Sequence, residues 1–306
     1  MKRSELVDEV LGNLAGYLTD QEMIGTIVAD NDTSVTVSLQ DFQPGLVEFG
    51  DGELVYVGDV TDTTLSGLIR GYRSTPTADA AGKQVRANPR YPKYNVLMAM
   101  NRCLDSLWPD LFQVKTKAIP NALGVTYYQL PEDCEDVLTV AQYDIRHDVA
   151  LPSAWRKCRY WTFMPDAPID PNNSHPDYGT TTGKGCQVQD AWQDEQAMVQ
   201  FTYTTKPGRF ETTLTEDEDF TTATGLPEWC EDVVVAGACY RLVSFVSAGE
   251  AAARTAEGDL LGTVGQKPQP SDMTELFYSV YKTRLKEATD RMRMSQNIGS
   301  VHYSGA

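Results

Sequence analysis

The sequence predicts an α+β fold in which amphipathic helices alternate with two regions of short strands. Apolar residues recur at three- and four-residue spacing near both ends of the chain and around 95–108. Strand-like segments separated by turn residues fill 26–86 and most of 113–224. The composition, 41% hydrophobic and 23% charged over 306 residues, is that of a folded globular protein with room for about two domains.

The first predicted element is a helix over 4–18, with Ser4 as its N-cap. Its apolar residues fall at helical spacing and form one stripe: Leu6, Val7, Val10, Leu11, Leu14 and Leu18. A stripe of this width is typical of a helix that packs one face against a core.

The pattern then changes to a period of two. Val35, Val37 and Leu39 alternate with small polar residues, which predicts a half-buried strand. GLVEFG, GELVYVGDV and TTLSGLIRGY are further short strand candidates, with turn residues between them. These features predict a small antiparallel barrel or sandwich.

A second helix is expected over 95–108, ending before Pro109, whose ring cannot continue the hydrogen-bond ladder. From 113 to 224 the sequence is β-like again, with long irregular loops. The segment 165–185 is rich in Pro, Asn, Asp and Gly, and we expect it to be a loop.

Two further helices are predicted near the C-terminus. The first, over 229–247, is apolar on most sides and is expected to be buried. The second runs from an N-cap at Asp272 to about residue 294. Its stripe consists of Met273, Leu276, Phe277, Val280, Tyr281, Leu285 and Met292. The final segment, 295–306, is expected to be an unanchored arm.

A search for catalytic motifs in the sequence finds no specific pattern. There are only three histidines, with no nucleophile motif beside them and no paired cysteines for zinc. GTTTGKG at 179–185 is one residue too short for a phosphate loop. A pair of carboxylates for glycoside hydrolysis is neither identified nor excluded by the sequence, because 43 acidic residues produce many such pairs by chance. We therefore expect no enzymatic activity, no cofactor and no metal site.

Charge and cysteine usage narrow the class of protein further. The formal charge of −17 argues against DNA recognition by clustered cations. The start of the chain lacks the apolar segment of a signal peptide, and the apolar run 233–243 contains Arg241 and is too short to span a bilayer. The six scattered cysteines predict reduced, mostly buried thiols of a protein made in a cytosol.

Several segments, taken in order, suggest a family. GELVYVGDV and LSGLIRGYRST are followed by PRYPKYNVLMAMNRCLDSLWPDLF, YYQLPEDCEDVLTV, TGLPEWCEDVVVAGACYRLV and FYSVYKTRLKEATDRM. This order resembles the head-to-tail connector (adaptor) proteins of tailed bacteriophages, particularly siphophages that infect actinobacteria.

The resemblance implies a helical-bundle connector core made of residues 1–22, 88–112 and 225–294. A small β-domain at 23–87, a β-rich domain at 113–224 and an extended C-terminal arm at 295–306 would be added to it. The protein would form a dodecameric ring beneath the portal in the neck of the virion, joining head to tail and continuing the DNA channel.

The resemblance also implies partners. The portal protein would lie above the ring and a stopper or tail-completion protein below it. Double-stranded DNA would pass without specific binding, and assembly would take place in the host bacterial cytoplasm without a membrane. The arm residues expected on the portal are Ile298, Val301, His302 and Tyr303. The helix residues expected between subunits are Phe277, Tyr281, Arg284 and Arg291.

Two alternatives stay open. A tail-tip or baseplate module would bind cell-wall carbohydrate through aromatic side chains, with candidates at Trp155, Tyr160, Trp161, Phe163 and Trp192. A glycoside hydrolase would need two carboxylates placed across a sugar, and the sequence identifies no such pair.

Overall fold

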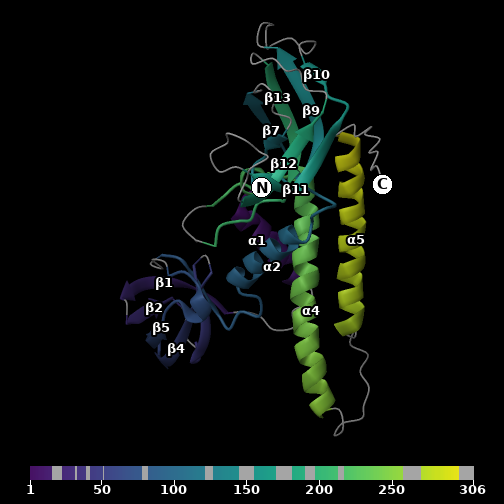
Figure 1. The fold of residues 1–306 in the computed structure, drawn as a ribbon. Coiled ribbons are helices and arrows are strands. Elements are labelled where there is room, and N and C mark those ends of the chain that lie inside the picture. The colour runs from purple at the N-terminus through teal and green to yellow at the C-terminus, as the bar shows by residue number, and fades with distance from the viewer. Residues whose placement is uncertain are drawn as a thin grey trace. The chain divides into compact units, whose positions relative to one another are not determined.

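In the computed structural model, the chain divides into two compact units (Figure 1). The first comprises Met1–Ser106 and Gly208–Asp290, and the second Leu107–Pro207 and Arg291–Ala306. The structure describes residues 1–15, 23–31, 33–38, 42–50, 52–77, 82–120, 127–144, 155–169, 181–189, 197–212, 217–257 and 270–295.

The prediction of a helical-bundle core is wrong, because the described part of the chain is mostly β. It contains thirteen strands and five α-helices, and six of the strands close into a barrel. The mixed α+β character and the small barrel are compatible with the sequence prediction. The expected helices form, but they are a minority of the elements, and the last of them buries few side chains between 274 and 290, so it does not complete a four-helix core.

The barrel is antiparallel, with strand order β1-β2-β5-β4-β3-β6. Its strands are β1 (Met23–Asn31), β2 (Ser34–Val37), β3 (Gly45–Phe49), β4 (Glu53–Thr61), β5 (Thr64–Ile69) and β6 (Gln84–Ala87). The alternating apolar residues point inward, and Val35, Val47, Val55 and Leu65 lie in one buried cluster. Closing the sheet leaves these strands without an open edge.

A buried carboxylate connects the barrel to the next helix, α2 (Lys93–Asp105). Glu48 of β3 accepts a hydrogen bond of 2.6 Å from Arg86 of β6 and another from the backbone N–H of Lys93. The second bond satisfies one of the N–H groups that a helix leaves unpaired at its start. Burial raises the pKa of Glu48 despite the neighbouring cation of Arg86.

The other helices of the first unit are α1 (Arg3–Ala15), α3 (Phe220–Thr224), α4 (Glu231–Glu257) and most of α5 (Pro270–Ser295), with a 3-10 turn η4 (Glu228–Cys230) before α4. Side chains 233–239 of α4 are all buried. α2 and α5 both approach α4 at Gly237, where an added Cβ would lie 2.2 Å from Cys103 Sγ and 3.0 Å from Tyr281 Cε2. None of the described helices is long and apolar enough to cross a membrane.

The start of α1 is held by a carboxylate that is distant in sequence. Asp217 accepts hydrogen bonds from the Ser4 backbone N–H at 2.9 Å and from the Ser4 hydroxyl at 2.8 Å. Because α1 begins at Arg3, Ser4 lies in its first turn, and the prediction that Ser4 is the N-cap is wrong. Glu5 instead reaches back to the Lys2 N–H at 2.9 Å, as the third helical residue does in a capping box.

The second unit contains two antiparallel sheets with the strand orders β10-β9-β13-β7 and β11-β12-β8. The strands are β7 (Gln113–Pro120), β8 (Tyr127–Gln129), β9 (Asp136–Asp144), β10 (Trp155–Lys157), β11 (Trp161–Ile169), β12 (Thr181–Val188) and β13 (Ala197–Thr205). Val140 and Phe201 of the first sheet share a buried cluster with Tyr128 and Val188 of the second, so the sheets pack face to face.

The expected loop over 165–185 is partly wrong, because both ends of this segment belong to strands β11 and β12. Residues 170–180 lie outside the described part. A register shift between Met164 and Ala167 accommodates the prolines of β11. Gly185 leaves space for β11, since a Cβ there would lie 2.9 Å from the Ala167 Cβ.

Candidate functional site

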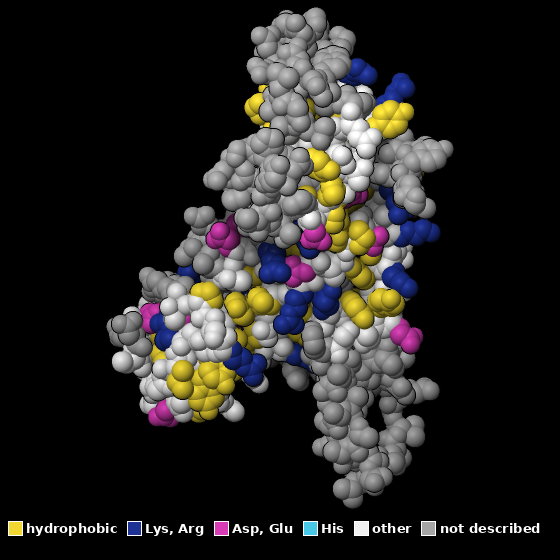
Figure 2. Space-filling model, in the orientation of Figure 1, with side chains coloured by type: hydrophobic (Ala, Val, Ile, Leu, Met, Phe, Trp, Pro, Cys, Tyr) yellow, Lys and Arg dark blue, Asp and Glu magenta, His cyan; other side chains and the backbone are white. Residues whose placement is uncertain are grey.

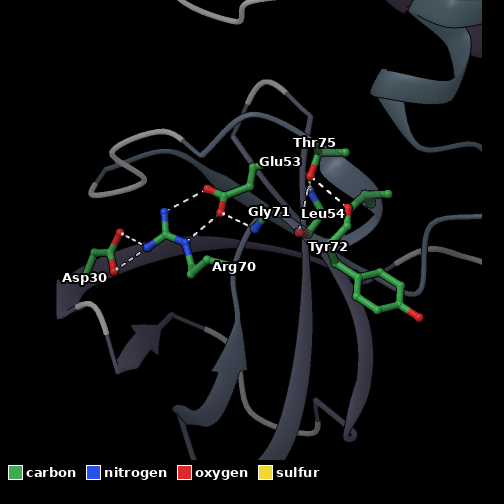
Figure 3. A network of polar contacts seen from close by, with 7 residues as sticks. All are labelled: Asp30, Glu53, Leu54, Arg70, Gly71, Tyr72 and Thr75. Atoms are coloured by element: carbon green, nitrogen blue, oxygen red, sulfur yellow. Dashed lines mark hydrogen bonds and ion pairs between the residues drawn. The ribbon is translucent and has the colours of Figure 1, made fainter.

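One end of the barrel is organised around the guanidinium of Arg70. Glu53 begins β4, Arg70 directly follows β5, and Asp30 lies near the end of β1, so closure of the barrel brings the three together (Figure 3). Arg70 Nε and Nη2 each donate to one oxygen of Glu53 at 2.7 Å, and Nη1 donates to Asp30 Oδ2 at 3.1 Å. This bidentate arrangement fixes the plane of the guanidinium.

The Arg70 network is shielded from solvent. The Glu53 side chain is 1% exposed, and the guanidinium lies 5.6 Å from the centroid of the Phe49 ring. Hydrogen bonds from Arg70 to Glu53 are the main cause that raises the arginine pKa above its usual value. The three side chains therefore form a buried network of ion pairs that orients the residues after Arg70.

The turn after Arg70 is held in an unusual backbone conformation. Gly71, Arg73 and Ser74 have φ values of 62°, 57° and 62°, the left-handed region that side chains other than glycine rarely adopt. Gly71 adopts this region without strain, but non-glycine residues such as Arg73 and Ser74 cost about 1–3 kcal/mol each there and persist only where surrounding contacts impose them. We call Arg70–Thr75, which includes the 3-10 turn η1 (Tyr72–Ser74), the RGYRST turn.

Specific hydrogen bonds impose this conformation. The Gly71 N–H donates to Glu53 Oε1 at 3.2 Å, so the buried carboxylate binds both the side chain and the backbone of the turn. Thr75 Oγ1 accepts from the Leu54 N–H at 3.0 Å and donates to the Tyr72 carbonyl at 3.0 Å (Figure 3). Both ends of the turn are thus fixed to the start of β4.

The fixed turn displays an aromatic surface. The Tyr72 ring points away from the ion pairs (Figure 3). It lies 6.0 Å from the ring of Tyr56, and the Arg73 guanidinium lies over it at 5.8 Å. The strand register places Leu46, Tyr56 and Ile69 in a row across β3, β4 and β5. We call Leu46, Tyr56, Ile69, Tyr72 and Arg73 the barrel patch.

The barrel patch is accessible to solvent. Tyr56 is 42% exposed and Ile69 is 56% exposed, and Figure 2 shows hydrophobic side chains gathered over the barrel. Large apolar side chains that are exposed next to one another are a common sign of a protein contact surface. Tyrosine and arginine are also the residues most often found at the energetic centres of such contacts.

The buried thiols are poorly suited to nucleophilic chemistry. Burial raises the pKa of Cys134, Cys186, Cys230 and Cys239 to about 12 and that of Cys103 to about 11. A nucleophilic cysteine needs the opposite shift, because the thiolate is the reactive form. Within the described part of the chain, no three His, Cys, Asp or Glu side chains are grouped so that they could hold a metal ion.

The four helix residues predicted between subunits all lie on α5. Tyr281 is half-buried, its ring stacked 6.3 Å from Tyr240 of α4, so it packs within its own chain. Phe277 is also half-buried. Arg284 is exposed and lies 4.0 Å from Asp232 and 3.2 Å from Glu287, and Arg291 is exposed. The predicted arm residues Ile298, Val301, His302 and Tyr303 lie outside the described residues.

Sequence reasoning did not identify the barrel patch as a site. The segments GELVYV and RGY were noted only as part of a family resemblance. A stronger signal was present: an arginine between an apolar strand and a Gly-Tyr pair, with acids at Asp30 and Glu53 in two other strand candidates of the same region. Its meaning depends on the pairing of β4 with β5, which the sequence alone did not specify.

Comparison with known proteins assigns this chain to no family. The sequence matches no protein-family model, and it matches no curated protein.

Proposed function

We propose that this chain is a non-enzymatic structural protein of the neck of a tailed bacteriophage. It forms a ring beneath the portal, joins head to tail and continues the channel through which DNA passes. The observation that carries the proposal is the barrel patch, an exposed apolar and aromatic surface beside a turn fixed by hydrogen bonds, which suits contact with another protein. The order of sequence segments shared with head-to-tail connectors supports the same function.

The charge of the chain suits such a conduit. A formal charge of −17 per copy gives a surface that mostly repels DNA phosphates. A channel that lets DNA slide needs weak binding, whereas a DNA-binding protein needs clustered cations. Acidity also favours solubility, so the charge supports the proposal without defining which acids line the channel.

The proposal includes defined partners. The portal protein lies above the ring and a stopper or tail-completion protein lies below it. The ring assembles in the host bacterial cytoplasm and ends up in the virion. The C-terminal residues 295–306 bind the portal by adding a strand to an exposed edge.

Purified particles provide the test. Quantitative mass spectrometry should find the chain in virions in a fixed ratio to the portal protein, and gold-labelled antibodies should mark the junction of head and tail. Absence of the chain from particles, or labelling at the distal tail tip, would contradict the proposal.

A carbohydrate-binding module of the tail tip is the second candidate. The exposed ring of Tyr160 and the accessible tyrosines of the barrel patch favour it, since aromatic faces can stack on sugars. Sedimentation of the purified chain with host cell walls distinguishes the two functions. Co-sedimentation that Tyr160→Ala abolishes would favour the carbohydrate-binding module over the neck ring.

A further inference from the structure

We propose that the barrel patch of one copy binds the outward face of α5 in the next copy. This inference rests on the proposed ring and names the contact that closes it. Both surfaces carry exposed apolar side chains and belong to the same unit, and they differ in charge, because one contains Arg73 and the other Glu287.

The barrel patch is one of the two surfaces in the proposed contact, and its backbone is already ordered in the single chain. The backbone of the turn that carries Tyr72 and Arg73 is fixed to the start of β4, so little backbone freedom is lost when these residues are covered. Ile69 and Leu46 extend the apolar row on both sides of Tyr56. The surface is therefore suited to packing against the apolar side chains of another protein surface.

The outward face of α5 provides that partner. Leu276 is 50% exposed and Val280 is 41% exposed, and they lie one helical turn apart. Thr283 and Glu287 continue the same face, because spacings of three and four residues place side chains above one another. We call Leu276, Val280, Thr283 and Glu287 the α5 outer face.

The opposite face of α5 is used within the chain. Tyr278 and Tyr281 both pack near Tyr240 of α4, with ring centroids 5.1 Å and 6.3 Å away. The outer face is therefore the part of the described helix that remains for a second copy.

Charge supports a contact between different surfaces. Arg73 lies at the rim of the barrel patch, and Glu287 lies about 10 Å along α5 from Val280. Glu287 already pairs with Arg284 at 3.2 Å, but exposed pairs of this kind contribute little, so its carboxylate can accept a second cation. A contact between two barrel patches would instead bring the Arg73 guanidinium groups together.

The geometry of such a contact has a consequence for assembly. When two different surfaces of one chain bind each other, each copy can bind two neighbours, and the assembly forms a ring if the rotation between copies closes and an open filament if it does not. A self-complementary contact stops at a dimer. The chain also carries −17 formal charge, so copies repel one another unless apolar contacts offset the repulsion.

The test uses the full chain with two sets of substitutions. The barrel variant is Tyr56→Ser with Ile69→Thr, and the helix variant is Leu276→Ser with Val280→Thr. The matched control is Val28→Thr, which alters a β1 side chain that is 65% exposed but is not part of the barrel patch. Circular dichroism melting establishes that each variant is folded before its association is measured.

Analytical ultracentrifugation over a wide concentration range should show oligomers for the wild type and the control. Each variant alone should associate at least about tenfold more weakly. An equimolar mixture of the two variants should form a dimer and stop, because it retains one intact barrel patch and one intact α5 outer face.

Three outcomes would overturn the inference. The wild type could sediment as a monomer at every concentration, the two variants could assemble as well as the wild type, or the helix variant could dimerise alone through its intact barrel patch. None of these outcomes affects the location of the chain in virions, so failure of this contact is distinguishable from failure of the proposed function.

Discussion

Arg70 shows how one side chain can organise a surface that it does not itself form. Its guanidinium pairs with both Glu53 and Asp30, and the same Glu53 carboxylate accepts a hydrogen bond from the Gly71 N–H. The exposed residues Tyr72 and Arg73 therefore depend on a buried ion pair. At the residue scale, the charges of Arg70, Glu53 and Asp30 have a structural role, because they hold the RGYRST turn in its conformation.

Replacing Arg70 with alanine should destabilise the protein by about 3 kcal/mol, because Glu53 would be left buried without its cation. Chemical denaturation monitored by fluorescence measures the loss. Arg73→Ala is the matched control, since Arg73 is exposed, and it should change stability by less than about 0.5 kcal/mol. Equal effects of the two substitutions would refute the structural role of Arg70.

Gly237 marks the closest approach of α2, α4 and α5. Gly237→Ala should destabilise the protein by about 1–3 kcal/mol, since the new Cβ would lie 2.2 Å from Cys103 Sγ. Gly12→Ala, in α1 with nothing within 4 Å, should stabilise it by up to about 1 kcal/mol. Adding Cys103→Ala to Gly237→Ala should recover part of the loss in a double-mutant cycle of thermal melts.

At the scale of elements, two helices start on carboxylates that come from elsewhere in the chain. Asp217 receives the Ser4 N–H of α1, and Glu48 receives the Lys93 N–H of α2. Negative charge at a helix start interacts favourably with the unpaired N–H groups there. Both helices are thereby tied to segments that are far away in sequence.

The hydrogen bonds of Asp217 at the start of α1 predict that the stability of the protein depends on pH in the acid range. Although desolvation alone would raise the pKa of Asp217, hydrogen bonds from Ser4 and nearby Lys2 and Arg3 lower it below the usual 3.8. The stability it contributes is present above that unfolded-state pKa and is lost as pH falls through the lower folded-state pKa. Asp217→Ala should cost about 1 kcal/mol at neutral pH and reduce the acid sensitivity of the melting temperature.

The comparison for this cap is Asp110, an exposed carboxylate outside the described helices. Asp110→Ala should leave the acid dependence of melting unchanged. If the Asp217 and Asp110 variants lose stability along the same pH curve, the Asp217 cap does not contribute to the acid dependence.

At the scale of the whole molecule, the proposed assembly would have to overcome the repulsion between acidic copies. At 0.1 M ionic strength, salt largely screens interactions between exposed charges that lie more than about 10 Å apart, and this distance shortens as the salt concentration rises. Self-association of the wild type should therefore strengthen with salt, measured as a shift to larger species in sedimentation velocity. Weaker association in salt would indicate that attraction between charged groups, rather than apolar packing, dominates the contact.

The sequence alone determined which segments are helical or extended where the periodicity was long. Val35 and Val37 alternate because one side of a strand faces the barrel core, and the stripe of α1 lies at helical spacing because one side of the helix is buried. Local rules of this kind depend only on neighbouring residues, so they can be read from a single chain.

Only the tertiary structure decided what those segments build. The helices did not form the expected bundle core, and the prolines and glycines of 165–185 did not prevent strands, because a bulge in β11 and the small residue Gly185 let the two strands pair. The barrel patch likewise required the register that places Tyr56 beside Ile69. Contacts between residues distant in sequence depend on strand pairing and chain closure, which local periodicity does not encode.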